Sequence, residues 1–210
     1  MNNFYYQYPQ YLWAHEIYSL LKDYNIIGKR NFLDAPCGNG IISYWLYNKF
    51  NISQIELIDS HSESVNLAKK YLPELNVSCQ NIFNLNLNLR KNDIWLFINS
   101  LYCLENGELV ISHLKKRSEY IIGIFPHINH NNYKSFFEKN PGFRNPTELN
   151  ENETIMLFNS NGYDLLFKKS ITYIPYHKYH FRGDRIIFNI FDRFISFLKG
   201  AYWISLFKRK

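Results

Sequence analysis

The sequence predicts an α/β protein with a doubly wound, seven-stranded, mostly parallel sheet and helices on both faces. Short apolar runs typical of buried strands alternate with helix-like segments through the first 125 residues, as in a parallel sheet. The first run, 32–34, passes through a loop with two glycines directly into a helix-like segment at 41–49. The second run, 55–58, is followed at once by an acid. Both features are typical of the edge at which such a sheet binds ligands.

The other elements follow in the order that this fold requires. One helix is predicted to begin within 60–63 with a serine cap and to run through Tyr71 to Pro73, and another is predicted at 147–158 before a stop at Gly162. The remaining strands are predicted at 77–80, 94–98, 120–125, 164–173 and 203–207. At 210 residues the chain is long enough for one domain with a sizeable core, so we expect a single domain, 1–210.

Residues 33–40, Leu-Asp-Ala-Pro-Cys-Gly-Asn-Gly, are the most informative stretch of the chain. Asp34 ends the strand, where its carboxylate can accept hydrogen bonds from a ligand amine or hydroxyl. Gly38 and Gly40 let the backbone come close to a ligand, because a side chain there would block it. The loop lacks the Lys-Ser/Thr pair of a phosphate-binding P-loop, so the pattern favours a nucleoside over a triphosphate.

The second strand ends at Asp59, which follows Asp34 by 25 residues. An acid at this place in a doubly wound sheet accepts hydrogen bonds from the hydroxyls of a bound ribose. The alternative is that both acids are strand-end caps in a fold that binds no ligand. The glycines between the two acids favour the ligand-binding interpretation.

In four motifs taken in order, residues 31–106 resemble class I S-adenosylmethionine-dependent methyltransferases. The glycine loop is similar to the family's first motif, 55–60 to its second, and 92–104 to its fourth. Gln80-Asn81-Ile82 falls where the family usually has an acid that faces the adenine, so Asn81 is a departure, with a simple turn residue as its alternative. Pro36 is another, since it stands where the family often has glycine and it removes an N–H.

The resemblance implies S-adenosyl-L-methionine as cofactor and no metal. It divides the domain into an N-terminal aromatic helical cap (1–30), a cofactor-binding half (31–125) and a substrate-side half (126–210). The cofactor-binding residues that it implies lie at the ends of the first four strands: Asp34, Ala35, Gly38, Gly40, Asp59, Ser60, Asn81, Ile82 and Asn99.

A catalytic base is needed only if the methyl acceptor is a hydroxyl or a protonated amine. His127, directly after the fifth predicted strand, is the best-placed candidate. His130 is the second, and His177 and His180 are candidates from the segment at 175–200. A surface or core histidine is the alternative for each of them.

Charge and motif content favour a small-molecule acceptor, methylated on oxygen or nitrogen. Of the net charge of +6, residues 181–210 supply +5, so the rest of the chain is nearly neutral and a broad nucleic-acid surface is not expected. The Asn/Asp-Pro-Pro-Tyr/Phe signature of base-amino methyltransferases is absent, because the fourth strand ends in Asn99-Ser100-Leu101-Tyr102.

Two other classes of protein stay open. A nicotinamide-dependent oxidoreductase shares the glycine loop and the ribose acid, but Ser43 stands where its third glycine is expected. A non-catalytic binding protein with the cofactor fold is the other alternative. Intact Asp34, Gly38, Gly40 and Asp59 favour retained cofactor binding but do not by themselves imply turnover.

Several features indicate a cytoplasmic protein. The three cysteines, Cys37, Cys79 and Cys103, are odd in number and show no metal-binding spacing, which is typical of a reducing compartment. No run of 18 apolar residues predicts a membrane span, and the first residues lack the pattern of a secretion signal.

Two aromatic segments have alternative roles. The insert at 175–200 contains an amphipathic helix at 185–199, which docks on the body, roofs the acceptor pocket, or makes peripheral contact with a membrane surface. The N-terminal aromatic residues form a lid over the cofactor or pack in the ordinary way: Tyr5, Tyr6, Tyr8, Tyr11 and Trp13.

Overall fold

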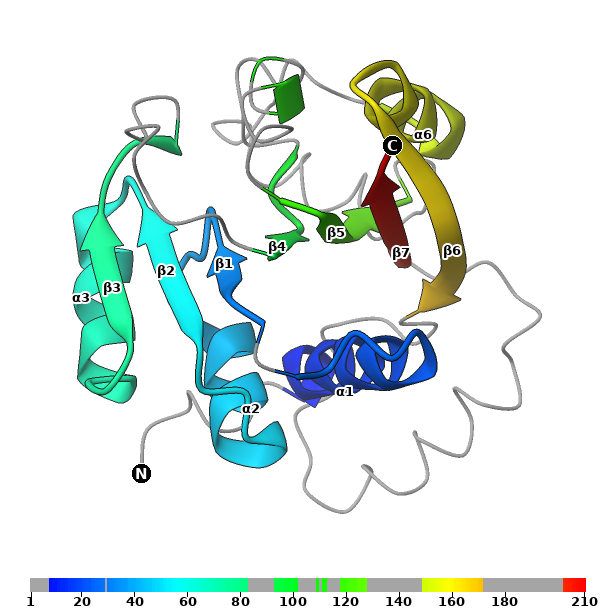
Figure 1. Cartoon of the computed structure of the whole chain (residues 1–210). Coiled ribbons are helices and arrows are strands. Elements are labelled where there is room, and N and C mark those ends of the chain that lie inside the picture. Colours follow the sequence, from blue (N-terminus) through cyan, green and yellow to red (C-terminus); the bar gives the residue numbers. More distant parts are fainter. Residues whose placement is uncertain are drawn as a thin grey trace.

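The computed structural model describes residues 8–28, 30–82, 93–101, 109, 111–112, 118–127, 149–171 and 202–210 (Figure 1). The predicted insert at 175–200, with His177 and His180, lies outside the described residues, as do His130 and Cys103. The helices are α1 (Tyr8–Asp23), α2 (Ile41–Phe50), α3 (Ser62–Tyr71) and α6 (Glu151–Ser160). The strands are β1 (Phe32–Asp34), β2 (Ile55–Asp59), β3 (Asn76–Cys79), β4 (Ile94–Ile98), β5 (Tyr120–Pro126), β6 (Tyr163–Ile171) and β7 (Tyr202–Arg209).

The strands form a seven-stranded sheet in the order β3-β2-β1-β4-β5-β7-β6. The first five strands of the chain are parallel, whereas β7 runs antiparallel to both of its neighbours, β5 and β6. The predicted seven-stranded, mostly parallel α/β sheet is therefore confirmed, and the predicted strands lie within a few residues of the observed ones.

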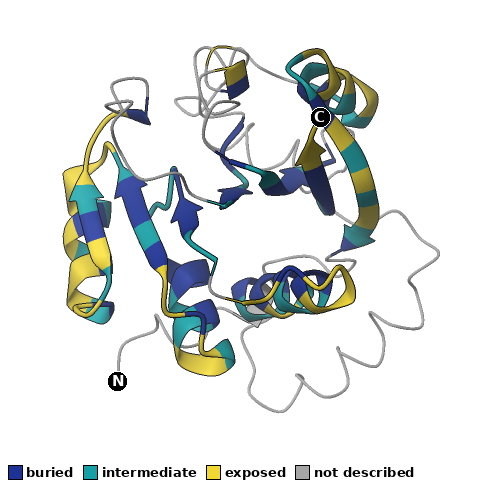
Figure 2. Ribbon diagram, in the orientation of Figure 1, coloured by how far each residue is buried: buried dark blue, intermediate teal, exposed yellow. Residues whose placement is uncertain are grey.

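Helices cover both faces of the sheet, as expected (Figure 1). Because side chains alternate along a strand, Phe32 and Ile94 join the core under α1, α2 and α3, while Leu33 and Trp95 join the core under α6. In Figure 2 the central strands are almost wholly buried, which explains why their sequences are continuous apolar runs.

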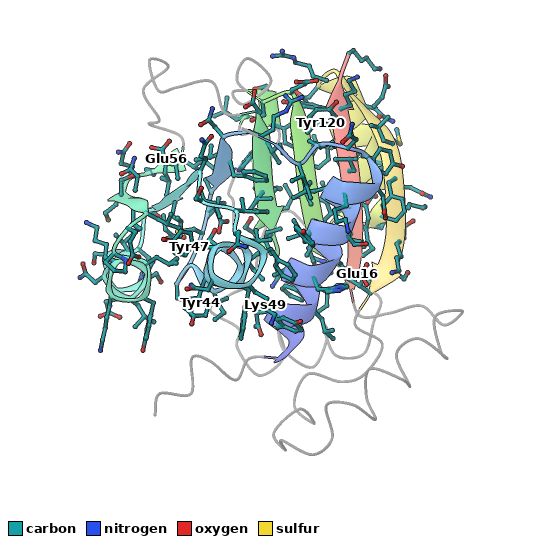
Figure 3. All side chains as sticks on the ribbon, turned by 60° about the horizontal axis from the view of Figure 1, so that its bottom comes forward. Glu16, Tyr44, Tyr47, Lys49, Glu56 and Tyr120 are labelled. Atoms are coloured by element: carbon teal, nitrogen blue, oxygen red, sulfur yellow. The ribbon has the colours of Figure 1, made fainter. Side chains whose placement is uncertain are left out.

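The N-terminal helix α1 contributes one side of its surface to the hydrophobic core. Figure 3 shows α1 and α2 side by side in front of the sheet. The Trp13 ring packs edge-on against Tyr202, with centroids 4.8 Å apart, and Tyr11 packs against Trp45 at 5.1 Å. For Tyr11 and Trp13 the packing alternative is therefore the observed one. Tyr5 and Tyr6, and the side chain of Tyr8, lie outside the described part.

Two helix starts differ from the sequence prediction. The cap of α3 is His61 and not a serine: its Nδ1 accepts a hydrogen bond from the Ser64 N–H at 3.4 Å. The helix predicted at 147–158 begins at Glu151, where Asn150 and Glu153 form a reciprocal capping box. A side chain that satisfies a free N–H decides each start, which is why the predicted boundaries moved.

Candidate functional site

The predicted cofactor-binding residues lie at one edge of the sheet. Strands β1 to β5 are parallel, so their carboxyl ends meet at this edge. The chain builds the sheet outward from β1 in one direction through β2 and β3, and in the other through β4 and β5. The boundary between β1 and β4 is thus a topological switch point, the place where open α/β sheets bind ligands.

Asp59 holds the glycine loop and the start of α3 together. Its Oδ2 accepts a hydrogen bond from the Gly38 N–H at 2.8 Å, and its Oδ1 accepts one from the His61 N–H at 2.8 Å. Each carboxylate oxygen keeps further lone-pair capacity for a ligand hydroxyl. Gly38 and Asp59, which are 21 positions apart and were predicted to share one site, are therefore in direct contact.

Glycine is needed at the two loop positions, 38 and 40, for different physical reasons. Gly38 has φ +53°, and a Cβ added there would meet nothing within 4 Å. Gly40 has φ +72°, and its Cβ would lie 2.9 Å from Leu57 Cδ2 and 3.2 Å from Ala68 Cβ. Only Gly38 thus faces open space, while Gly40 allows the start of α2 to pack on β2 and α3. This packing is a reason for glycine at position 40 that the sequence analysis did not predict.

Asp34 lies below the loop with 2% of its surface exposed. The Ser43 hydroxyl donates a hydrogen bond to its Oδ2 at 2.6 Å. Burial raises the pKa of Asp34 to about 7, the Ser43 hydrogen bond opposes this shift, and the nearby Asp59 adds to it. Since burial disfavours the ionised carboxylate, this site is suited to a cationic partner.

Asn99, at the carboxyl end of β4, combines backbone strain with an unpaired polar atom. Its φ is +49°, in the left-handed region, and its buried Oδ1 has no hydrogen-bond partner. The next residue, Ser100, is 5% exposed and its Oγ also has no partner. Positive-φ Asn51, by contrast, is the C-cap of α2. Strain and unsatisfied buried atoms are tolerated mainly at functional sites.

The remaining predicted residues border the same edge. Ser60 and Asn81 are exposed at the ends of β2 and β3, and Ile82 is buried. The Gln80 N–H donates to the Asp59 carbonyl at 2.9 Å, which brings the end of β3 beside Asp59. Ala35 follows β1 and is fully buried. The structure therefore brings all nine predicted cofactor residues to this edge.

No protein-family model matches the chain, and no curated protein matches it in sequence. Solved structures do match. The chain is similar to an S-adenosylmethionine-dependent methyltransferase from Thermotoga maritima, described as a possible histamine N-methyltransferase. The TM-score is 0.69 at 14% identity, over 99% of this chain and 93% of that one.

Two further structures were solved with S-adenosylhomocysteine. Magnesium protoporphyrin IX methyltransferase from Synechocystis PCC 6803 matches with a TM-score of 0.65 at 17% identity, over 95% of this chain and 83% of that one. The plantazolicin methyltransferase BamL matches with a TM-score of 0.66 at 15% identity, over 96% and 84%. The chain has the class I S-adenosylmethionine-dependent methyltransferase fold. At these identities the likeness defines the fold, and the site must be argued from this chain's own residues.

Within this methyltransferase fold, His127 follows β5 at the same edge and is 4% exposed. Its Nε2 lies 3.3 Å from Ser170 Oγ, and its Nδ1 lies 3.7 Å from Glu151 Oε2. Glu151 also pairs with Lys168. Its two ring nitrogens thus lie near protein groups of β6 and α6.

Sequence reasoning missed three residues that shape the methyltransferase-fold site. Ser43 binds Asp34, His61 caps α3 beside Asp59, and the Trp95 indole Nε1–H donates to the Ala35 carbonyl at 2.7 Å. Trp95 was predicted as core, which its full burial confirms, but its polar end also contacts the loop. Nothing in the local sequence signals any of these contacts.

Two of the three cysteines lie in the described part of the chain. Neither Cys37, in the loop, nor Cys79, at the end of β3, forms a disulfide. Burial, with the nearby acids Asp34 and Asp59, raises the pKa of the Cys37 thiol well above its usual range, which disfavours the reactive thiolate. Among the described residues, no three His, Cys, Asp or Glu side chains form a metal site. In the same part of the chain, no helix is long and apolar enough to cross a bilayer.

Proposed function

We propose that this protein transfers a methyl group from S-adenosyl-L-methionine to an oxygen or nitrogen of a small-molecule acceptor. One observation carries the proposal: Asp59 at the end of β2 accepts a hydrogen bond from Gly38 of the glycine loop, at the switch point of a methyltransferase fold. When bound, the cofactor supplies an electrophilic methyl group on a sulfonium ion.

The chain's own residues have separate tasks in this proposal. Asp59 holds the ribose hydroxyls through the lone pairs that its two backbone contacts leave open. Gly38 lets the loop backbone approach the ligand, since its Cβ direction faces open space. Asp34 lies beneath the loop as the buried acid that complements a cationic cofactor. Ala35, Gly40, Ser60, Asn81, Ile82 and Asn99 complete the proposed site.

On the acceptor side, catalysis consists mainly of aligning the acceptor with the methyl group and excluding water. We assign to His127 the removal of the acceptor's proton, because it lies past the end of β5 at the cofactor edge. A nearly neutral chain outside residues 181–210 supports a small-molecule acceptor over a nucleic acid, and we propose a cytoplasmic location.

Isothermal titration calorimetry with S-adenosylhomocysteine tests the proposal, with NAD as the probe for the oxidoreductase alternative. Native protein should bind S-adenosylhomocysteine and not NAD. Asp59→Ala should weaken binding by about 1.5–3 kcal/mol, the usual worth of hydrogen bonds to a charged acceptor. Unchanged affinity in a folded Asp59→Ala protein contradicts the assignment.

Two further variants make the result specific. Asp164→Ala removes an exposed carboxylate of β6 that pairs with Lys210, and it should leave S-adenosylhomocysteine affinity unchanged. Asp59→Asn keeps an oxygen for the Gly38 N–H but loses the charge, so its affinity should fall between those of the native protein and Asp59→Ala.

A further inference from the structure

We propose that Trp95 is a positioning residue for the cofactor loop, defined as residues 35–40. Its indole N–H fixes the Ala35 carbonyl and so sets the path of the loop before any ligand arrives. The inference rests on the proposed cofactor site and adds to it a residue of β4 that is not one of its nine proposed residues.

The contact joins two strands through a side chain. Trp95 pairs in register with Leu33 on the neighbouring strand β1, yet its Nε1–H reaches the Ala35 carbonyl, two residues further along. The donor-to-acceptor distance is 2.7 Å, and the Trp95 side chain is fully buried. A short hydrogen bond shielded from water is held firmly, because no solvent molecule competes for either partner.

The loop is otherwise held mainly from β2. The Cys37 N–H donates to the Ile58 carbonyl at 2.9 Å, and the Gly38 N–H donates to Asp59 at 2.8 Å. From β4 the backbone offers only the Ala35 N–H to Leu96 carbonyl bond, which is long at 3.4 Å. Among the described contacts, the Trp95 indole is therefore the stronger tie between the loop and β4.

The position of Ala35 explains why its hydrogen bond with Trp95 affects the whole loop. Ala35 directly follows Asp34, and it precedes Pro36, which has no N–H to contribute to the loop. The Ala35 carbonyl thus marks the point where the chain leaves β1 toward Gly38. A rotation of its peptide group would displace Gly38 from Asp59, and ordering the loop afresh would then reduce cofactor affinity.

The indole itself is held in place by the core beneath α6. Its ring lies 4.7 Å from the ring of Phe97, which in turn contacts Phe125 and Phe158. A smaller apolar residue would keep this strand position apolar, but only tryptophan adds a donor that reaches the loop. The choice of tryptophan thus serves the loop as well as the core.

The test compares two tryptophan-to-phenylalanine variants. Trp95→Phe keeps an aromatic ring but removes the N–H, and we expect S-adenosylhomocysteine to bind roughly 3–10-fold more weakly. Trp203→Phe is the matched control: it makes the same change at a buried site on β7, which is separated from β4 by β5. Both variants lose buried aromatic volume, so both should show a lower melting temperature.

The decisive comparison is between the S-adenosylhomocysteine affinities of the two variants. If Trp95→Phe loses affinity while Trp203→Phe keeps it, Trp95 positions the loop. If both lose affinity equally, or Trp95→Phe binds like the native protein, Trp95 is only a core residue and the inference is overturned. Native protein that does not bind S-adenosylhomocysteine at all contradicts the proposed function instead.

A second measurement uses the native protein, should Trp95→Phe fail to fold. The NMR signals of the four tryptophan indole N–H groups are first assigned by elimination with Trp13→Phe, Trp45→Phe and Trp203→Phe. S-adenosylhomocysteine is then added to the native protein. We expect the Trp95 signal to shift and its hydrogen exchange to slow, while the Trp203 signal stays unchanged. A Trp95 signal that is unaffected at saturation overturns the inference.

Discussion

Two acids at neighbouring strand ends have opposite surroundings. Asp59 is partly exposed and accepts hydrogen bonds from two backbone N–H groups, whereas Asp34 is buried and receives one from the Ser43 hydroxyl. Backbone donors stabilise a carboxylate, and burial destabilises it. At the residue scale, Asp59 keeps lone pairs that suit the hydroxyls of the proposed ligand, and ionised Asp34 carries an energetic penalty that a cationic ligand would relieve.

That penalty makes stability depend on pH through Asp34. Its pKa is about 7 in the folded protein against an ordinary value of 3.8, so folding favours the protonated acid. The contribution of Asp34 to stability is full below pH 3.8 and is lost as pH rises through about 7. Asp34→Asn cannot ionise, so the free energy of unfolding of the variant should improve relative to native by about 4 kcal/mol between pH 4 and pH 8.

Urea unfolding of both proteins across this pH range measures the difference. The remaining titratable groups are shared by the two proteins, so they cancel in the comparison. A difference that stays constant from pH 4 to pH 8 would show that folding does not raise the pKa of Asp34. The same series with S-adenosylhomocysteine present then shows whether a bound ligand lowers the pKa of Asp34.

At the level of secondary-structure elements, the two glycines of the strand–loop–helix unit from β1 to α2 have different roles. An alanine at either position is strained by positive φ, at about 1–2 kcal/mol. Only the Gly40 Cβ also collides with buried groups, namely Leu57 and Ala68. One glycine thus belongs to the packing of α2, and the other to the open side of the loop.

The two alanine variants should therefore fail in different ways. Gly40→Ala should lose about 1–3 kcal/mol of stability from overpacking in addition to the strain. Gly38→Ala should lose only the strain, but its methyl group enters the space where the proposed cofactor lies, so S-adenosylhomocysteine affinity should fall at least 10-fold. Denaturant unfolding and calorimetry on the same samples separate the two effects. Equal losses of stability in both variants would argue against the packing role of Gly40.

At the scale of the whole molecule, His127 joins three elements that are distant in sequence. It follows β5, its Nε2 meets Ser170 of β6, and its Nδ1 faces Glu151 at the start of α6. Strand β6 reaches this place because β7 lies antiparallel between β5 and β6, which brings the end of β6 to the cofactor edge. The cluster exists only in the assembled fold.

If His127 takes the acceptor's proton, His127→Ala should lower turnover by roughly 10²–10⁴-fold while S-adenosylhomocysteine affinity is kept. Turnover is measured as S-adenosylhomocysteine release with a panel of hydroxyl and amine acceptors. His15→Ala, an exposed histidine of α1, is the control and should be neutral. Native-like turnover in folded His127→Ala would mean that His127 serves only to join β5, β6 and α6.

Local sequence patterns were enough to predict the order of strands and helices, the glycine loop, and the acids Asp34 and Asp59 at the carboxyl ends of their strands. These features depend on local patterns: apolar runs, the backbone freedom of glycine, and the rule that parallel strands end at one edge. The last rule places the ends of these strands together whatever the loops do, and the nine cofactor-binding positions that the resemblance implies stay a prediction.

Which side chains meet across the sheet could not be predicted from the sequence. The Trp95 contact with Ala35 spans 60 positions, and the contact of His127 with Ser170 spans 43. The assignment of Gly40 to packing likewise needed Leu57 and Ala68 in place. Local patterns carry no information on these pairs, because each depends on strand order, register and side-chain direction, which the packing of the two cores fixes all at once.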